Sequence, residues 1–234
     1  MHRPLLTVAL ALVPLFTACG LLDDATTFTL ETGWKQVSID SAALGVAIPS
    51  GTLIPAVACT KTNDICAQAS AGISCNGQTY SCNVQCSDQG SCEIVADAEV
   101  GQTVDISQKV KNQTSATVLS KVSFSYMLFK VLENTLTFDT PQIEVFVGPN
   151  TAVRTTDAGV VKFATMDVIP KSQTPEGQLT VTDAGKASLA GFVKNYETPF
   201  KFFVKAGLRF PSGSALPQGK LTLQVNGYFE VEPL

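Results

Sequence analysis

The clearest pattern in the chain is an alternation over residues 93–100, where apolar positions on one side alternate with Glu93, Val95, Asp97 and Glu99 on the other. A period of two residues is typical of a β-strand that buries one face. We expect this strand to continue past Gly101, with a bulge at that glycine. The apolar positions, continuation included, are Ile94, Ala96, Ala98, Val100, Val104 and Ile106.

Shorter stretches of similar pattern follow, separated by loops rich in Gly and Pro. They predict further strands at 118–126, 135–139, 143–147, 160–169 and 178–182. In the first of these, Val122, Phe124 and Tyr126 are expected to share one face. Strands at this density, joined by such loops, favour a mainly β fold, an antiparallel β-sandwich.

The chain closes with two long alternating stretches, 200–210 and 221–231. The loop 211–219 between them predicts a wide hairpin. In an antiparallel hairpin Lys201 would lie near Glu230, a cross-strand pair of modest worth.

One short helix interrupts the strands. Asp183 is the expected cap and Pro199 the expected stop. Between them, apolar residues recur at positions i, i+3, i+4 and i+7, which is typical of a helix with one buried stripe. These residues are Leu189, Phe192, Val193 and Tyr196.

The pattern of the first residues predicts an export signal. A basic start containing Arg3 precedes the apolar run 5–16, which is too short to span a bilayer at about 20 residues. Thr17-Ala18-Cys19 resembles the lipobox of bacterial lipoproteins, and the resemblance covers the first 20 residues. It implies that Cys19 is acylated and becomes the mature N-terminus. By analogy, Gly20 after it implies the outer membrane. The alternative is an ordinary signal peptide cut near Ala18, which leaves a free cysteine.

Six cysteines remain besides Cys19, all within 59–92. An even number of clustered cysteines in an exported chain indicates a disulfide framework. Turn residues between the later cysteines favour sequential pairing, although fifteen connectivities are open. The expected pairs are Cys59–Cys66, Cys75–Cys82 and Cys86–Cys92. A zinc site is the alternative, but the spacing is wrong for one and no histidine lies nearby.

These features divide the chain into a signal peptide (1–18), a lipidated tether (19–34), a disulfide-stapled region (35–92) and a β-sandwich (93–234). Charge follows a similar division. Residues 19–108 carry ten acidic side chains and two lysines, whereas 109–234 carry ten acidic and thirteen basic ones. The sparse, mildly acidic charge argues against disorder and against a nucleic-acid partner.

Catalytic chemistry is limited by the absence of imidazole. The single histidine, His2, lies in the signal peptide. The mature chain therefore lacks the usual general base, and triad catalysis and typical zinc or copper sites are excluded. We expect no enzyme, no metal and no cofactor. A glycosidase that uses two carboxylates stays open, because it needs no histidine.

The strongest candidate binding feature is a stripe on the outer side of the strand 200–210. It comprises Lys201, Phe203, Lys205 and Arg209. An aromatic among three cations would suit an anionic partner, such as lipid headgroups or an acidic polysaccharide. The alternative is a soluble sheet face whose charges are partly paired.

Calcium is a second candidate, because oxygen ligands suit it. The acidic residues concerned are Asp64, Asp88, Glu93, Asp97 and Glu99. The alternative is a solvated strand face.

Together these observations predict a lipid-anchored envelope protein with a non-catalytic binding or structural role. Its expected partners are the membrane, through the lipid, and an envelope protein or glycan. A carrier of a hydrophobic or lipid ligand is the alternative, and a carboxylate-only glycosidase is a further one.

Overall fold

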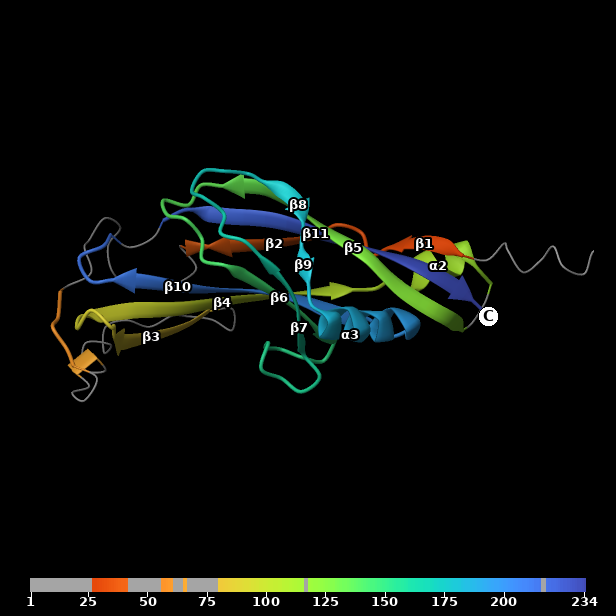
Figure 1. The fold of residues 1–234 in the computed structure, drawn as a ribbon, viewed down its shortest axis with the longest axis horizontal. Coiled ribbons are helices and arrows are strands. Elements are labelled where there is room, and N and C mark those ends of the chain that lie inside the picture. Colours follow the sequence, from red (N-terminus) through yellow and green to blue (C-terminus); the bar gives the residue numbers. More distant parts are fainter. Residues whose placement is uncertain (1–26, 42–55, 61–64, 67–79, 116–117, 216–217) are drawn as a thin grey trace, which may run out of the picture.

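The computed structural model describes residues 27–41, 56–60, 65–66, 80–115, 118–215 and 218–234. Two antiparallel sheets lie one above the other as a β-sandwich (Figure 1). The predicted fold class is therefore confirmed. Neither helix among the described residues is long and apolar enough to cross a membrane.

The first sheet, called the β11 sheet, has five strands in the order β1-β11-β5-β8, with β2 also paired to β11. Both β1 and β2 pair with the same side of the chain's last strand, β1 at 228–231 and β2 at 220–225. β1 and β2 therefore occupy successive stretches of the same edge of β11. The strands are β1 (Phe28–Glu31), β2 (Lys35–Asp40), β5 (Leu119–Asn134), β8 (Glu176–Gln178) and β11 (Lys220–Pro233).

The second sheet, called the β10 sheet, has six strands in the order β3-β4-β10-β6-β7-β9. Its longest pairing joins β4 to β10 along twelve residue pairs without a register shift. The strands are β3 (Tyr80–Cys86), β4 (Cys92–Val104), β6 (Ile143–Pro149), β7 (Val161–Met166), β9 (Thr180–Val181) and β10 (Phe200–Pro211).

Aromatic rings join the two sheets in the core. Phe124 of β5 lies edge-to-face against Phe163 of β7 at 5.4 Å between centroids, and against Phe229 of β11 at 5.6 Å. Phe163 in turn contacts Phe202 of β10 at 6.0 Å. Burying a phenylalanine contributes about 1.5–3 kcal/mol, and edge-to-face pairs add about 0.5–1.5 kcal/mol. This cluster therefore crosses between the sheets and holds them face to face.

The predicted helix is α3 (Asp183–Lys194). It packs on β5 and β7, which belong to different sheets, so it covers one side of the sandwich. The cap is Thr182 rather than the expected Asp183, because the Thr182 hydroxyl accepts the N–H of Gly185 at 2.9 Å. A β-carbon at Gly185 would lie 2.6 Å from the backbone of Phe163, so only glycine allows this approach.

A second helix was not predicted. α2 (Ser107–Gln113) follows β4 and buries one residue, Val110. Seven residues with one buried position carry no apolar stripe, so the sequence pattern gives little sign of this helix.

The expected hairpin between the last two long strands is wrong. β10 and β11 lie in different sheets, so the chain passes from one sheet to the other after β10. Lys201 is opposite Thr103 and Gly148, and Glu230 is opposite Thr29 and Ser123. Lys201 and Glu230 therefore do not pair. The predicted strand at 135–139 is also wrong, because β5 continues to Asn134 and irregular backbone follows.

The alternation over 93–100 is confirmed as the first part of β4. Ile94, Ala96 and Ala98 are buried, as expected. The bulge at Gly101 is wrong, because the register between β4 and β10 runs straight through it. Gly101 lies opposite Phe203, and a β-carbon there would lie 3.1 Å from the Phe203 ring. The glycine makes room for an aromatic ring across the strands.

Candidate binding surfaces

The predicted stripe on β10 lies on the outer face of the β10 sheet, but it is not an open row of cations. Phe203 is only 1% exposed. Lys201 Nζ donates to the Ala152 carbonyl at 2.6 Å and lies 5.7 Å from the Phe203 ring centre. Lys201 is therefore held to the connection between β6 and β7, which lies beneath this sheet in Figure 1.

The other two cations of the stripe meet acidic residues of β4. Lys205 Nζ lies 3.5 Å from Glu99 and 3.8 Å from Asp97. Arg209 pairs with Glu93 at 3.0 Å. This arrangement matches the alternative of a sheet face whose charges are paired.

Glu99 fixes the β6–β7 connection as well. Its carboxylate accepts the backbone N–H of Thr155 at 3.1 Å and the Thr155 hydroxyl at 2.9 Å. Within the same connection, Asp157 accepts the backbone N–H groups of Val153 and Arg154, which lowers the pKa of Asp157 below its ordinary value. The loop is therefore held both by its own turn and by the sheet above it.

The candidate calcium ligands fall into the same network. Glu93, Asp97 and Glu99 each lie against a cation of β10. A lysine or arginine side chain therefore takes the place beside these carboxylates that a calcium ion would need. Asp88 lies in the turn between β3 and β4, and Asp64 lies outside the described residues.

The sequential disulfide pairing is wrong. Cys59 is bonded to Cys86, and Cys66 is bonded to Cys92. Cys86 and Cys92 lie directly opposite each other at the end of the β3–β4 hairpin. Each is bonded to the incoming segment rather than to its neighbour. That segment runs along the turn, with Cys59 N–H donating to the Gly90 carbonyl and Cys92 N–H to Val57. Cys82 is also disulfide-bonded, and Cys75 and Cys19 lie outside the described residues.

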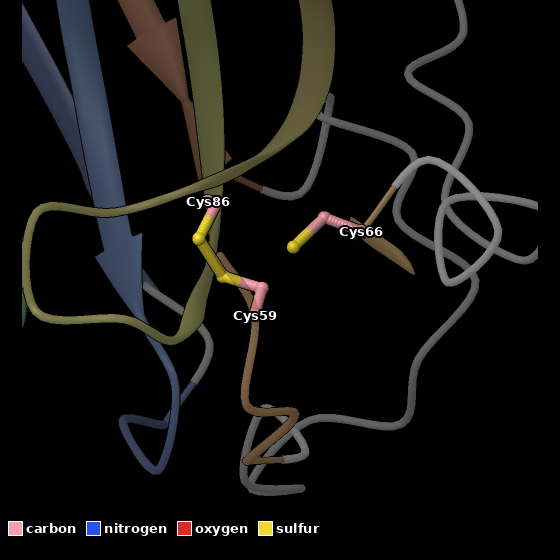
Figure 2. A group of neighbouring side chains, drawn as sticks. All are labelled: Cys59, Cys66 and Cys86. Carbon is pink, nitrogen blue, oxygen red and sulfur yellow. A yellow bond between two sulfur atoms is a disulfide. The ribbon is translucent and has the colours of Figure 1, made fainter. Parts of the chain in front are cut away.

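Three of these sulfur atoms gather closely. The Sγ atoms of Cys59, Cys66 and Cys86 lie within 4.8 Å of one another (Figure 2). Three sulfurs at this spacing would suit a soft metal as thiolates. All three are in disulfides, so the group is a covalent staple.

The space between the sheets near β2 and β10 contains a small cavity. Its volume is about 10 Å³, and its lining includes Ile39, Phe138, Ile143 and Leu208. A site for a drug-sized apolar ligand needs about 300–1,000 Å³. This cavity has room for about one water molecule.

The outer face of the β11 sheet carries an aromatic pair that the sequence pattern misplaced. Tyr126 was expected on the same face as Phe124, but the pairing of β5 with β11 shifts between them. Phe124 lies opposite Phe229 and Tyr126 lies opposite Tyr228, so Ser125 is an extra residue that turns Tyr126 outward. Tyr126 is 38% exposed, and its ring stacks on Tyr228 at 4.5 Å between centroids.

Hydrogen bonds fix this pair on the sheet. Asn226 is fully buried, and its amide donates to the Tyr228 hydroxyl at 3.0 Å and to Glu31 at 3.2 Å. The Thr32 hydroxyl donates to the Asn226 side-chain oxygen at 3.3 Å. Partial burial of the ring, then the Glu31 carboxylate and Tyr126, raise the pKa of Tyr228 above its ordinary value. The phenol therefore stays neutral and keeps its proton for donation.

Amide side chains extend the same face along β11. Gln224 lies two residues before Asn226 and is opposite Gln36 of β2. We call these residues together the tyrosine face. It comprises Glu31, Gln36, Tyr126, Gln224, Asn226 and Tyr228.

Comparison with known proteins gives no relative by sequence. No protein-family model matches the chain, and no curated protein matches it. One solved structure, described as a carbohydrate-binding module of the β-sandwich superfamily, shares 9% identity, with 86% of this chain and 54% of that chain covered and a TM-score of 0.27. The chain thus spans about half the length of that structure.

A second solved structure is that of Desmodium yellow mottle tymovirus. It also shares 9% identity, with 100% of this chain and 94% of that chain covered, at a TM-score of 0.24. At such scores neither likeness informs function. The β-sandwich is established by the pairing of the strands themselves.

Proposed function

We propose that the protein is exported, anchored to the cell envelope by a lipid on Cys19, and has a non-catalytic binding or structural role. The observation that carries the proposal is the pair of disulfides, Cys59–Cys86 and Cys66–Cys92. Disulfides form and persist in oxidising compartments outside the cytoplasm. Export agrees with the signal and lipobox-like residues at the start of the chain.

A binding role is supported by a difference between the two outer faces of the sandwich: one has its charges paired, and the other exposes groups that can contact a ligand. The acidic residues of β4 are held by cations of β10. The tyrosine face, in contrast, exposes the ring of Tyr126 and the amide-bearing Gln36 at the surface. We propose an envelope glycan or protein as the partner.

The carrier alternative is less well supported. The inter-sheet cavity of about 10 Å³ is far below what a lipid chain requires, and it is lined by core residues. A ligand held between the sheets would have to open the packed core, at the cost of the ring contacts that join the two sheets.

Metabolic labelling with an alkyne fatty-acid analogue tests the anchor. We expect the wild-type protein to be labelled and to stay with membranes, and Cys19→Ser to lose both properties. That variant keeps the six other cysteines, so it is the matched control for the disulfide region.

Mass analysis of the mature protein is the measurement that can contradict the anchor proposal. An unmodified Cys19, or thiols that react before reduction, would contradict the proposal. Release of reducing sugar from polysaccharides by the purified protein would contradict the non-catalytic role and favour the two-carboxylate glycosidase.

A further inference from the structure

We infer that the tyrosine face binds an uncharged polysaccharide chain, laid along β11 and stacked on the aromatic pair. This inference rests on the binding role proposed above and names its site and ligand class. It follows from the side chains of the face, from their fixed positions and from the local charge.

The aromatic pair supplies a stacking surface through Tyr126. The two rings stack on each other, so each covers one face of the other, and the exposed part of Tyr126 (38%) is what a sugar ring can reach. Tyr126 and Tyr228 lie side by side on adjacent strands, with a 23° angle between the ring planes. Tyrosine offers an apolar ring and a polar hydroxyl together. The C–H faces of a pyranose ring match the first, and its hydroxyl groups match the second.

The amide groups supply directional hydrogen bonding. Gln36 and Gln224 lie opposite each other in the register, and Gln224 lies two residues before Asn226 on β11. Each side-chain amide has two donors and an acceptor oxygen, as adjacent sugar hydroxyls require. From Gln224 to Tyr228 the strand runs about 14 Å at 3.4 Å per residue, which is longer than one sugar ring.

The face is built before any ligand arrives. Asn226, Thr32 and Glu31 hold Tyr228 through the hydrogen bonds described above. A ligand would therefore lose little free energy in ordering these side chains, because they are already in place.

Local charge selects against an anionic chain. Glu31 is opposite Tyr228, and Glu230 lies two residues further along β11. Both are exposed. Lys130, the cation nearest Gln224 in the register, lies opposite Glu176 of β8, and Lys121 pairs with Glu232 at 3.1 Å. Lys109 Nζ donates to the Glu31 backbone carbonyl at 3.2 Å, so one cation lies beside the two carboxylates. The net charge of these three groups is still negative, which repels uronic acids and phosphates.

The chain contains its own reporter of binding. Trp34 is the single tryptophan, is 44% exposed, and lies two residues beyond Thr32, which bonds to Asn226. Titration of the full-length mature protein in detergent, followed by tryptophan fluorescence, would use three neutral probes (hydroxyethylcellulose, laminarin and mannan). Alginate serves as the anionic probe.

We expect saturable binding of at least one neutral probe and none of alginate. Tyr126→Ala should weaken that binding about tenfold or more, since a lost aromatic contact of about 1.4 kcal/mol corresponds to a factor of ten. The matched control is Val168→Ala, which also trims an exposed apolar side chain (53% exposed) but lies after β7. It should bind as the wild type does.

Three results would overturn the inference: no neutral probe binds, alginate alone binds, or Tyr126→Ala binds as well as Val168→Ala. Urea unfolding of each variant shows whether it is folded, and a second variant, Gln224→Ala, keeps the test decisive should Tyr126→Ala unfold. Fatty-acid labelling of Cys19 on the same preparations reports separately on the anchor. A labelled protein that ignores every neutral probe therefore leaves the anchor proposal standing and removes this one.

Discussion

On the outer face of the β10 sheet, the charged side chains are paired with one another. The outer face of the β11 sheet instead carries aromatic and amide groups, part of which is exposed. We call the first the closed face and the second the open face. On the first, Lys205 lies between Asp97 and Glu99, and Phe203 is buried beneath its neighbours. On the second, Tyr126 is 38% exposed. The two faces belong to one sandwich and share one core. The difference therefore comes from the side chains of each face and from the β6–β7 connection that packs on the first.

That difference shows why a row of cations is a poor guide to binding. The stripe on β10 looks basic in sequence, but its partners come from β4, about a hundred residues earlier in the chain. A charge already paired on its own surface has little to offer a ligand. We therefore expect substitutions on the β10 face to change stability and those on the β11 face to change binding.

The largest expected effect is on the closed face. Phe203→Ala should lower the free energy of unfolding by about 3–5 kcal/mol, because the ring is 1% exposed and its removal leaves a cavity. Urea denaturation measures this loss. Tyr126→Ala is the comparison on the open face. An equal loss of unfolding free energy there would show that the side chains of the two faces contribute alike to stability, which would contradict the distinction.

Glu99→Ala should be next, at about 1.5–3 kcal/mol, because Thr155 loses two hydrogen bonds to a carboxylate and Lys205 loses its nearer partner. The control is Asp97→Asn, at 3.8 Å from Lys205 with a side chain 38% exposed, which should cost under about 1 kcal/mol. If the two variants unfold at the same urea concentration, Glu99 does not hold the β6–β7 connection.

A smaller coupling is expected between the two tyrosines. A double-mutant cycle with Tyr126→Ala and Tyr228→Ala should give an interaction free energy of about 0.5–1.5 kcal/mol, because the rings stack at 4.5 Å. If the losses of unfolding free energy in the two single variants add up to that of the double variant, the ring contact makes no contribution to stability.

The smallest effect is a shift in titration. The pKa of Tyr228 lies above the ordinary tyrosine value, so the folded chain keeps this proton longer than the unfolded chain. Stability should therefore fall as pH rises from the ordinary pKa toward the raised one. Glu31→Gln removes one cause of the raised pKa, and ultraviolet titration should place the ionisation at lower pH, with Tyr228→Phe identifying the signal. An unchanged titration would place Glu31 outside the electrostatic reach of the phenol.

Sequence reasoning succeeded where local pattern decides structure. The alternation over 93–100 and the stripe that contains Leu189 and Val193 both reflect burial of one face, and both elements form as expected. The tyrosine face was missed because one extra residue, Ser125, reverses the inside and outside of β5. A period-two pattern cannot show a bulge that only the partner strand defines.

The alternation of apolar and polar residues could not predict which strands pair with each other over long distances in the chain. Two consecutive alternating stretches resemble a hairpin, yet β10 and β11 belong to different sheets. Which sheet a strand joins depends on neighbours far along the chain, such as β4 for β10 and β5 for β11. The partners of Lys205 and Arg209 could not be named for the same reason.

The disulfide connectivity has a consequence for biogenesis. In an exported chain that emerges N-terminus first, Cys59 meets Cys66 long before Cys86 and Cys92 arrive, so early oxidation favours the consecutive bond. The native bonds instead interleave, each joining an early cysteine to a late one. A Cys59–Cys66 bond formed at that stage has to be undone by thiol–disulfide exchange, and a cell without a disulfide isomerase should then accumulate mispaired protein.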